Sequence, residues 1–128
     1  MEFNMRIYLW RMKKIYYLST CDTCRKIIQR LGGLHDFEKQ DIKAEAITSV
    51  QLKEMKDLAG SYEALFSRRA IKYKEMGLKD LELKENDYKR LILEEYTFLK
   101  RPVIISGKHI FAGNEEKNVA AAGKVIGK

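Results

Sequence analysis

The chain has 128 residues, of which 45% are hydrophobic and 34% are charged, and its formal net charge is +7 at pH 7. This length suits one domain with one core, and the composition is too apolar for a disordered chain. No run of residues approaches the roughly 18 apolar positions of a membrane span, so we expect no membrane insertion.

The basic residues are spread along the chain rather than gathered in one block. A spread of this kind indicates solvated faces, so we expect no direct binding of nucleic acid. The chain has two cysteines, Cys21 and Cys24, and both fall in one four-residue motif. Two cysteines so placed do not form a framework of structural disulfides. This usage is typical of a reducing compartment, and we predict a cytoplasmic, monomeric protein.

The first predicted strand covers residues 15–18, which are apolar and aromatic. Met12 stands before it like a start residue, so we expect residues 1–12 to be a non-native or disordered N-terminal extension. Neither repeats nor linkers rich in proline and glycine follow. Residues 13–128 are therefore predicted to form one domain.

A helix is predicted from Cys21 to the glycine pair at 32–33, because apolar residues recur in it at helical spacing and glycines favour a helix end. A second strand is predicted at residues 34–38. The sequence from Thr48 has the pattern of a capping box, which predicts a helix that ends at Gly60.

Further helices are predicted after a cap at Ser61, before a stop at Gly77 and after a cap at Asn86. The pattern then changes to a β-hairpin over residues 103–111, and Asn114 is expected to cap a last helix. The order is β-α-β, an all-helical insert of about 60 residues, then β-β-α. It predicts an α/β protein with a thioredoxin-like fold and a mixed four-stranded sheet.

The Cys-x-x-Cys motif stands at the predicted start of the first helix, where backbone N–H groups and the helix dipole stabilise a thiolate. Cys21 is therefore the candidate nucleophile, and Arg25 and Lys26 add positive charge one turn inside the helix. Cys24 lies three residues further on, which is close enough in a helix for a disulfide with Cys21. Attack by one thiol and resolution by the other can then occur within one molecule.

Two other interpretations of the motif stay open. A zinc site would need two more ligands, and His35 and His109 stand at spacings that match no common zinc module. Two inert buried cysteines would be more typical of the middle of a helix or strand. Neither histidine is assigned a function, because each falls in a strand pattern.

Arg101 is a candidate anion-binding residue, since a thiol enzyme acting on oxyanions needs bidentate donors beside its nucleophile. It immediately precedes Pro102, the only proline in the chain, at the start of the third predicted strand. Arg68 and Arg69 stand where one predicted helix ends and the next begins. That position fits a side chain in a cleft and equally one that faces solvent.

Four ordered blocks resemble the family of ArsC-type arsenate reductases, which includes Spx and the YffB-like thiol reductases. The blocks are YYLSTCDTCRK at 16–26, SRRAIKYKEMGL at 67–78, KRPVII at 100–105 and GKHIFAGNEE at 107–116. The resemblance implies a thioredoxin fold with a helical insert and a nucleophilic cysteine at Cys21. It also implies a functional arginine at Arg69 and a cis peptide bond between Arg101 and Pro102.

Two departures separate this chain from well-studied arsenate reductases. Those proteins have an Asn-Pro dipeptide before the cysteine and another arginine after the last strand, where this chain has Ser19-Thr20 and Ala112. Its Cys24 is similar to the second cysteine of Spx, a regulator that binds RNA polymerase and is switched on by disulfide formation. The resemblance therefore supports two hypotheses.

The leading hypothesis is an arsenate reductase-like thiol oxidoreductase that reduces an oxyanion or a disulfide, with Cys21 as nucleophile and Cys24 as resolving thiol. Its anion-binding residues would be Arg25, Arg69, Arg101 and Pro102. Thioredoxin, glutaredoxin or glutathione would restore the thiols, and no metal or organic cofactor is implied. The alternative is an Spx-like redox-sensing transcriptional regulator that binds RNA polymerase.

Overall fold

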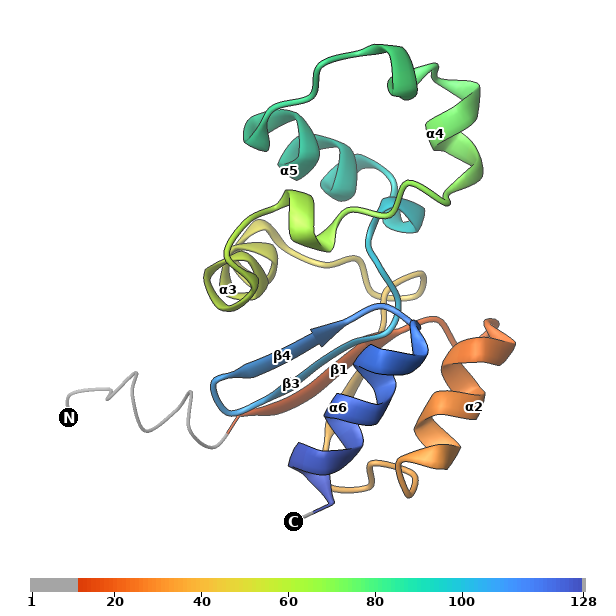
Figure 1. The fold of residues 1–128 in the computed structure, drawn as a ribbon, viewed down its shortest axis with the longest axis vertical. Coiled ribbons are helices and arrows are strands. Elements are labelled where there is room, and N and C mark those ends of the chain that lie inside the picture. Colours follow the sequence, from red (N-terminus) through yellow and green to blue (C-terminus); the bar gives the residue numbers. More distant parts are fainter. Residues whose placement is uncertain (1–11, 128) are drawn as a thin grey trace, which may run out of the picture. The chain divides into compact units, whose positions relative to one another are not determined.

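The computed structural model describes residues 12–127, and its contacts divide them into two compact units (Figure 1). The first unit consists of the described residues up to Asp41 and those from Arg101 onward, and the second is Ile42–Lys100. The predicted N-terminal extension, apart from Met12, lies outside the described residues. That residues 13–128 form one domain stays a prediction.

Within the described residues, the first unit has a four-stranded sheet and two helices (Figure 1). Its elements are β1 (Lys13–Tyr17), α2 (Asp22–Arg30), β2 (Glu38–Asp41), β3 (Val103–Ser106), β4 (His109–Ala112) and α6 (Glu116–Ile126). The strand order is β2-β1-β3-β4, in which β1 and β2 are parallel and the other neighbours antiparallel. The predicted mixed four-stranded sheet is confirmed.

The core of the first unit lies between the sheet and the two helices. Ile15 of β1 is fully buried and stands opposite Ile104 of β3 in the antiparallel register. Both pack with Ile27 of α2 and Val119 of α6 in one cluster of buried residues. Burial of such side chains stabilises the fold by about 1.5 to 3 kcal/mol each. This packing fixes the start of α2 beside the end of β1.

The helix predicted from Cys21 to the glycine pair is confirmed as α2. Gly32 and Gly33 follow it with φ of +84° and +89°, values that few side-chain-bearing residues adopt, and they turn the chain away from the helix axis. Leu34 follows in the same left-handed region, with φ of +49°.

The prediction of a second strand at residues 34–38 is wrong, because β2 covers Glu38–Asp41. The apolar residues Leu34 and Phe37 that suggested a strand are instead buried in the core from a turn, in which the Phe37 N–H donates to the Leu34 carbonyl at 3.0 Å. The strand itself is polar, and only Gln40 within it is buried. The sequence of β2 therefore lacks the apolar residues by which a strand can be predicted.

The second unit consists of helices and 3₁₀ turns, as predicted for the insert. Its elements are α3 (Ser49–Ala59), η1 (Glu63–Leu65), α4 (Ile71–Glu75), η2 (Leu78–Asp80), α5 (Glu85–Glu94) and η3 (Tyr96–Phe98). Phe66 is central to its core: the ring stacks on Phe98 at 5.0 Å between centroids and meets the edges of Tyr88 and Tyr73 at 4.9 and 6.1 Å. Aromatic pairs in such geometry add about 0.5 to 1.5 kcal/mol beyond area burial.

The helix caps were predicted with mixed success. The capping box of α3 is confirmed: the Gln51 N–H donates to the Thr48 hydroxyl at 3.0 Å, and the Thr48 N–H donates to the Gln51 side chain at 3.1 Å. Gly60 ends this helix with φ of +99°. Ser61 also accepts a hydrogen bond, from the N–H of Ala64 at 3.1 Å.

Two predicted caps are wrong. Helix α5 has Lys84 at its N-cap, and Asn86 lies inside its first turn. The Asp87 carboxylate accepts the Lys84 N–H at 2.9 Å, so the side-chain hydrogen bond at this helix start comes from the third helical residue and not from Asn86. Helix α6 likewise begins one residue later than predicted, with Glu115 rather than Asn114 at the N-cap.

Within residues 12–127, no helix combines the length and apolar character needed to cross a membrane.

The capping box gives a stability test. Thr48→Ala should lower the free energy of unfolding by about 1 kcal/mol, because it leaves a helix N–H without its acceptor. Ser49→Ala is the matched control, since Ser49 is exposed and does not cap the helix. Chemical denaturation of both variants measures the difference. Equal stabilities would mean that the box contributes nothing.

Candidate functional site

Cys21 occupies the N-cap of α2, directly after the turn that follows β1. Its N–H donates to the Leu18 carbonyl at 3.1 Å, and its own carbonyl accepts the Arg25 N–H at 3.1 Å. The backbone N–H groups of Thr23 and Cys24, at the start of the helix, lower the pKa of its thiol. A thiol thus stands where other helices carry a capping oxygen, at the positive end of the helix dipole.

The two thiols lie together but differ in exposure. Cys21 and Cys24 are 3.6 Å apart, and neither is in a disulfide. Cys24 is completely buried, whereas Cys21 is partly exposed. Only the sulfur of Cys21 can therefore be reached by a molecule that arrives from solvent.

The environment lowers the pKa of Cys21. Partial burial opposes ionisation, but hydrogen bonds from the Cys24 N–H, the Cys24 thiol and the Thr23 N–H outweigh it, and the positive charge of Arg101 adds to them. Each of these groups stabilises the thiolate more than the thiol. The nucleophilic form is therefore favoured at Cys21.

The same neighbourhood acts in the opposite direction on Cys24. Burial raises the pKa of its thiol to about 11; the Cys21 sulfur adds to this effect, while the Leu18 N–H and Arg101 reduce it. A pKa of about 11 keeps the Cys24 thiol protonated at neutral pH. The two neighbouring thiols therefore have pKa values shifted in opposite directions.

Arg101 and Pro102 lie beside this turn because β3 runs antiparallel to β1. Val103, the first residue of β3, stands opposite Tyr16 near the C-terminal end of β1. Arg101 and Pro102, which precede Val103, therefore lie at the same end of the strands as Cys21. The peptide bond between Arg101 and Pro102 is cis, as the resemblance implied. Within the described chain no carboxylate pairs with the Arg101 guanidinium, so its charge is available to the thiolate or to an anion.

The other two predicted arginines are placed differently. Arg25 is hydrogen-bonded to Asp22, which neutralises its charge, and it is not among the groups that lower the pKa of Cys21. Arg69 belongs to the second unit, is exposed, and makes no hydrogen bond or ion pair within the described residues. Its neighbour Arg68 is held by Glu63 at 2.8 Å. A role of Arg69 at the thiols stays a prediction.

Sequence reasoning missed a contact that holds the turn before Cys21. The hydroxyl of Ser19 donates to the carboxylate of Asp41 at 2.5 Å. Asp41 is the last residue of β2 and stands opposite Tyr17, the last residue of β1, in the parallel register. The C-terminal ends of the two strands therefore lie side by side. Only the pairing of β1 with β2 could have revealed this contact.

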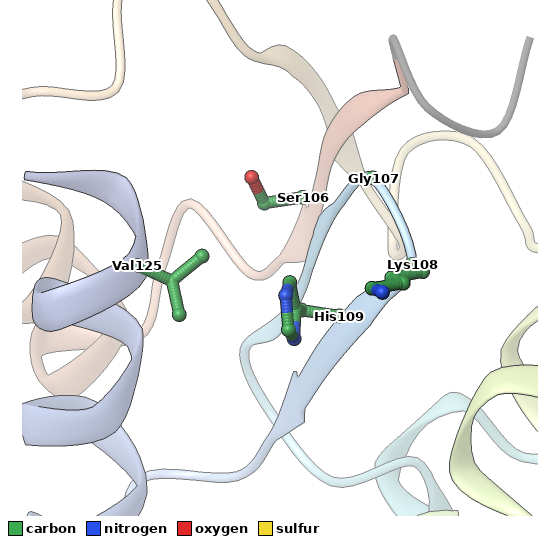
Figure 2. Close-up of a pocket in the computed structure, with 5 residues that line it drawn as sticks. All are labelled: Ser106, Gly107, Lys108, His109 and Val125. Atoms are coloured by element: carbon green, nitrogen blue, oxygen red, sulfur yellow. The ribbon is translucent and has the colours of Figure 1, made fainter. Parts of the chain in front are cut away.

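The first unit also has surface hollows. One of about 170 Å³ lies along α2, starting at Thr23. Another, of about 190 Å³, is lined by Ser106, His109 and Val125 with the hairpin turn between the strands (Figure 2). Ser106 stands opposite Lys13 at the start of β1, whereas the cysteines follow the end of that strand. This second hollow thus lies at the opposite end of β1 from the thiols.

In the part of the chain that the structure describes, His, Cys, Asp and Glu side chains nowhere gather in a group of three or more that could hold a metal ion.

The thiol environments predict an order of alkylation. Iodoacetamide at neutral pH should label Cys21 well before Cys24, because only Cys21 combines access with a lowered pKa. In Arg101→Gln the rate of Cys21 labelling should rise at higher pH than in the wild type, since removal of a cation raises the pKa of a thiol.

The double substitution Asp22→Asn with Arg25→Gln is the control. It removes an ion pair whose net charge is zero, so the pH dependence of Cys21 labelling should stay near that of the wild type. Peptide mapping by mass spectrometry measures both sites at each pH. First labelling of Cys24 would reverse the assignment of the two thiols.

Comparison with known proteins gives a family match. The model of the ArsC family matches residues 16–122. Global transcriptional regulator Spx 2 of Bacillus anthracis is 25% identical over 111 residues, which are 84% of this chain and 84% of that protein.

Solved structures are similar in fold. An arsenate reductase from Vibrio cholerae has a TM-score of 0.70 and 17% identity over 87% of this chain and 98% of that one. The protein SACOL0876 of Staphylococcus aureus has a TM-score of 0.70 and 26% identity over 86% and 97%. The predicted thioredoxin-like fold is confirmed. Because the family match spans most of its length, the chain belongs to the ArsC family.

Proposed function

We propose that the protein is a thiol oxidoreductase that reduces an oxyanion or a disulfide. The observation that supports it most is the unequal pair of thiols, in which Cys21 is accessible with a lowered pKa and Cys24 is buried with a pKa of about 11. A nucleophile and a resolving thiol need this difference, because only one of them should attack first.

The reaction begins when the Cys21 thiolate attacks the substrate and forms a covalent adduct. A protonated oxyanion would lose water in this step, and a disulfide would lose one of its halves as a thiolate. The adduct removes the negative charge that opposed ionisation of Cys24. Cys24 then loses its proton and attacks the Cys21 sulfur, which releases the reduced product and leaves a disulfide between the two cysteines. The two electrons that reduce the substrate come from the two thiols.

Arg101 would stabilise negative charge on the substrate in this scheme. Its guanidinium is not paired with a described carboxylate, acts electrostatically on Cys21 and offers two parallel donors to an oxyanion. The family's arsenate reductases carry Asn-Pro and an arginine where this chain has Ser19-Thr20 and Ala112. Arsenate and a disulfide are therefore both candidate substrates.

The oxidised protein would need an external thiol reductant to begin another cycle. Thioredoxin, glutaredoxin and glutathione can each reduce an accessible disulfide by thiol exchange, and Cys21 is the sulfur that they would reach. The reaction needs no metal or organic cofactor.

A second candidate is a redox-sensing regulator that binds RNA polymerase. The observation that favours it is the match to Spx 2, which covers 84% of both chains and whose name is that of a global transcriptional regulator. In such a protein the disulfide between Cys21 and Cys24 would alter a binding surface instead of completing a catalytic cycle. Retention of purified RNA polymerase by the oxidised protein, and not by the reduced one, would favour this candidate.

A turnover assay tests the leading proposal. The protein is incubated with arsenate, and separately with a small disulfide, in the presence of thioredoxin, glutaredoxin or glutathione. We expect catalytic reduction with at least one combination and none in Cys21→Ser. Stoichiometric oxidation of the protein without turnover in any combination would reject the enzyme and support the sensor.

Mild oxidation should join Cys21 to Cys24 within one molecule. The spacing of three residues along a helix allows the roughly 4.4 to 6.8 Å between Cα atoms that a disulfide needs. The product should migrate as a monomer on a non-reducing gel and lack free thiols. Exclusive disulfide-linked dimers, or two free thiols after peroxide treatment, would contradict a redox role for the pair.

Substitution of Arg101 tests its role in charge stabilisation. Arg101→Lys keeps the charge but loses the forked donors, so it should lose activity much as Arg101→Ala does. The loss expected for one oxyanion donor is about 2.7 to 4 kcal/mol, or roughly a hundredfold to a thousandfold in rate.

Thermal melts of the same variants separate chemistry from folding. Stability should change little, because the Arg101 side chain is partly exposed and pairs with no described carboxylate. Wild-type turnover in Arg101→Ala would remove Arg101 from the site. A large fall in Tm would make its role structural.

A further inference from the structure

Two hydrogen bonds hold the turn that precedes Cys21. Residues 18–21 form a β-turn, in which the Cys21 N–H donates to the Leu18 carbonyl at 3.1 Å. Ser19 occupies the first corner of this turn, and its hydroxyl donates to the Asp41 carboxylate at 2.5 Å. A hydroxyl that donates to a carboxylate at this distance makes a charge-assisted hydrogen bond, which is stronger than one between neutral groups.

The acceptor of the second bond is fixed by the sheet. Asp41 is the last residue of β2 and stands opposite Tyr17 in the parallel ladder with β1. Leu18, at the start of the turn, is buried, whereas Ser19 and Thr20 are exposed. Within residues 12–127 the bond to Asp41 is the one side-chain hydrogen bond made by these two exposed residues. It therefore ties the outer part of the turn to the sheet.

The position of the Cys21 sulfur depends on the geometry of this turn. Cys21 has the extended conformation of an N-cap residue, with φ of −92° and ψ of 114°, and the turn sets the direction from which the chain enters α2. The N–H groups of Thr23 and Cys24 act on the sulfur only from short range, because hydrogen bonds weaken steeply with distance and angle. A turn that opens would reduce their effect.

The charges around the sulfur leave room for such an effect. The titratable and charged groups that act on Cys21 are Cys24, from α2, and Arg101, from the segment before β3. The exposed ion pair in the first turn of α2 has no net charge. Asp41 is not among the groups that act on Cys21, although Ser19 is two residues away. Its carboxylate thus anchors the turn without opposing ionisation of the thiol.

We propose that Ser19 and Asp41 are positioning residues for Cys21, and that the hydrogen bond between them keeps the sulfur at the first N–H groups of α2. The proposal deepens the proposed function, on which its bearing on turnover rests, by adding two residues that act through the nucleophile. Neither is a catalytic residue, because neither needs to touch the substrate. The polar strand β2 thereby supplies an acceptor that the reactive turn requires.

The main test is the rate at which iodoacetamide labels Cys21 in the full chain across a range of pH. Ser19→Ala should slow labelling at neutral pH about two- to tenfold, the factor that corresponds to one hydrogen bond of ordinary net strength. At a pH where the thiol is fully ionised the rates should converge, because the substitution changes the pKa and not the access. Ser19→Thr keeps the hydroxyl and should restore most of the wild-type profile.

Two substitutions of Asp41 separate geometry from charge. Asp41→Asn removes the charge but keeps an oxygen acceptor, so labelling should stay within about twofold of the wild type. Asp41→Ala removes the acceptor and should reproduce Ser19→Ala. Because both single substitutions break the same bond, the double variant Ser19→Ala with Asp41→Ala should slow labelling no further. Faster labelling in Asp41→Asn would mean that Asp41 acts by its charge, which would overturn the proposal.

A matched control exists at the other end of β1. The Lys13 ammonium contacts the Asp36 carboxylate at 2.7 Å, so this ion pair also joins β1 to the segment that leads into β2. Asp36→Ala removes the same charge as Asp41→Ala and breaks an exposed link of similar length. It should leave the pH profile of Cys21 labelling at that of the wild type.

Labelling of Cys24 separates positioning from local unfolding. Cys24 is completely buried, so a turn that simply unfolds would expose it. We expect Cys24 to stay as unreactive in Ser19→Ala as in the wild type. Increased labelling of Cys24, or equal slowing of Cys21 in Asp36→Ala, would make the role of the bond structural. An unchanged pH profile in Ser19→Ala would also overturn the proposal.

Failure of this proposal is distinguishable from failure of the proposed function, because labelling does not depend on turnover. If Ser19→Ala changes the pH profile and the wild type reduces neither arsenate nor a disulfide, the positioning of the thiol holds and the oxidoreductase fails. If the wild type turns over and Ser19→Ala matches it in labelling and in turnover, the oxidoreductase holds and the positioning role fails.

Discussion

The position of the Cys21 sulfur at the N-terminal end of α2, where the backbone N–H groups of Thr23 and Cys24 favour its ionised form, is the constraint on which the rest of the site depends. These N–H groups are free to act on the sulfur because α2 begins at Asp22, which leaves the first N–H groups of the helix without backbone partners. The helix start is held in turn by the burial of Ile27 against the sheet. A core contact thus determines the chemistry of a surface atom.

The difference between the two thiols follows from one helical turn of distance. Cys21 stands outside the helix and reaches its N–H groups, while Cys24 lies inside the first turn and points into the packed interior. Identical side chains therefore acquire opposite pKa shifts. Neither shift needs a metal or an unusual side chain, only a boundary between helix end and core.

Local signals predicted much of this fold, and long-range pairing explains what they missed. The capping box at Thr48 and the start of α2 depend on neighbours in the sequence, so their residues could be recognised directly. The polar strand β2 exists because β1 offers it a parallel edge, and the bond from Ser19 to Asp41 exists only once those strands pair. The sequence suggested both Arg25 and Arg101 as cations near Cys21; Arg25 is paired with Asp22, and Arg101, 80 positions beyond Cys21, is the arginine that lowers the pKa of that thiol.

In the proposed oxidoreductase, the guanidinium of Arg101, which pairs with no carboxylate among the described residues, would couple oxidation to surface electrostatics. In the reduced protein its positive charge favours the Cys21 thiolate, whose negative charge offsets it. A disulfide between Cys21 and Cys24 carries no charge, and its formation leaves a net cation at the same spot. The oxidised molecule would therefore present a more positive potential there, and its attraction for acidic molecules would report the redox state of the cell.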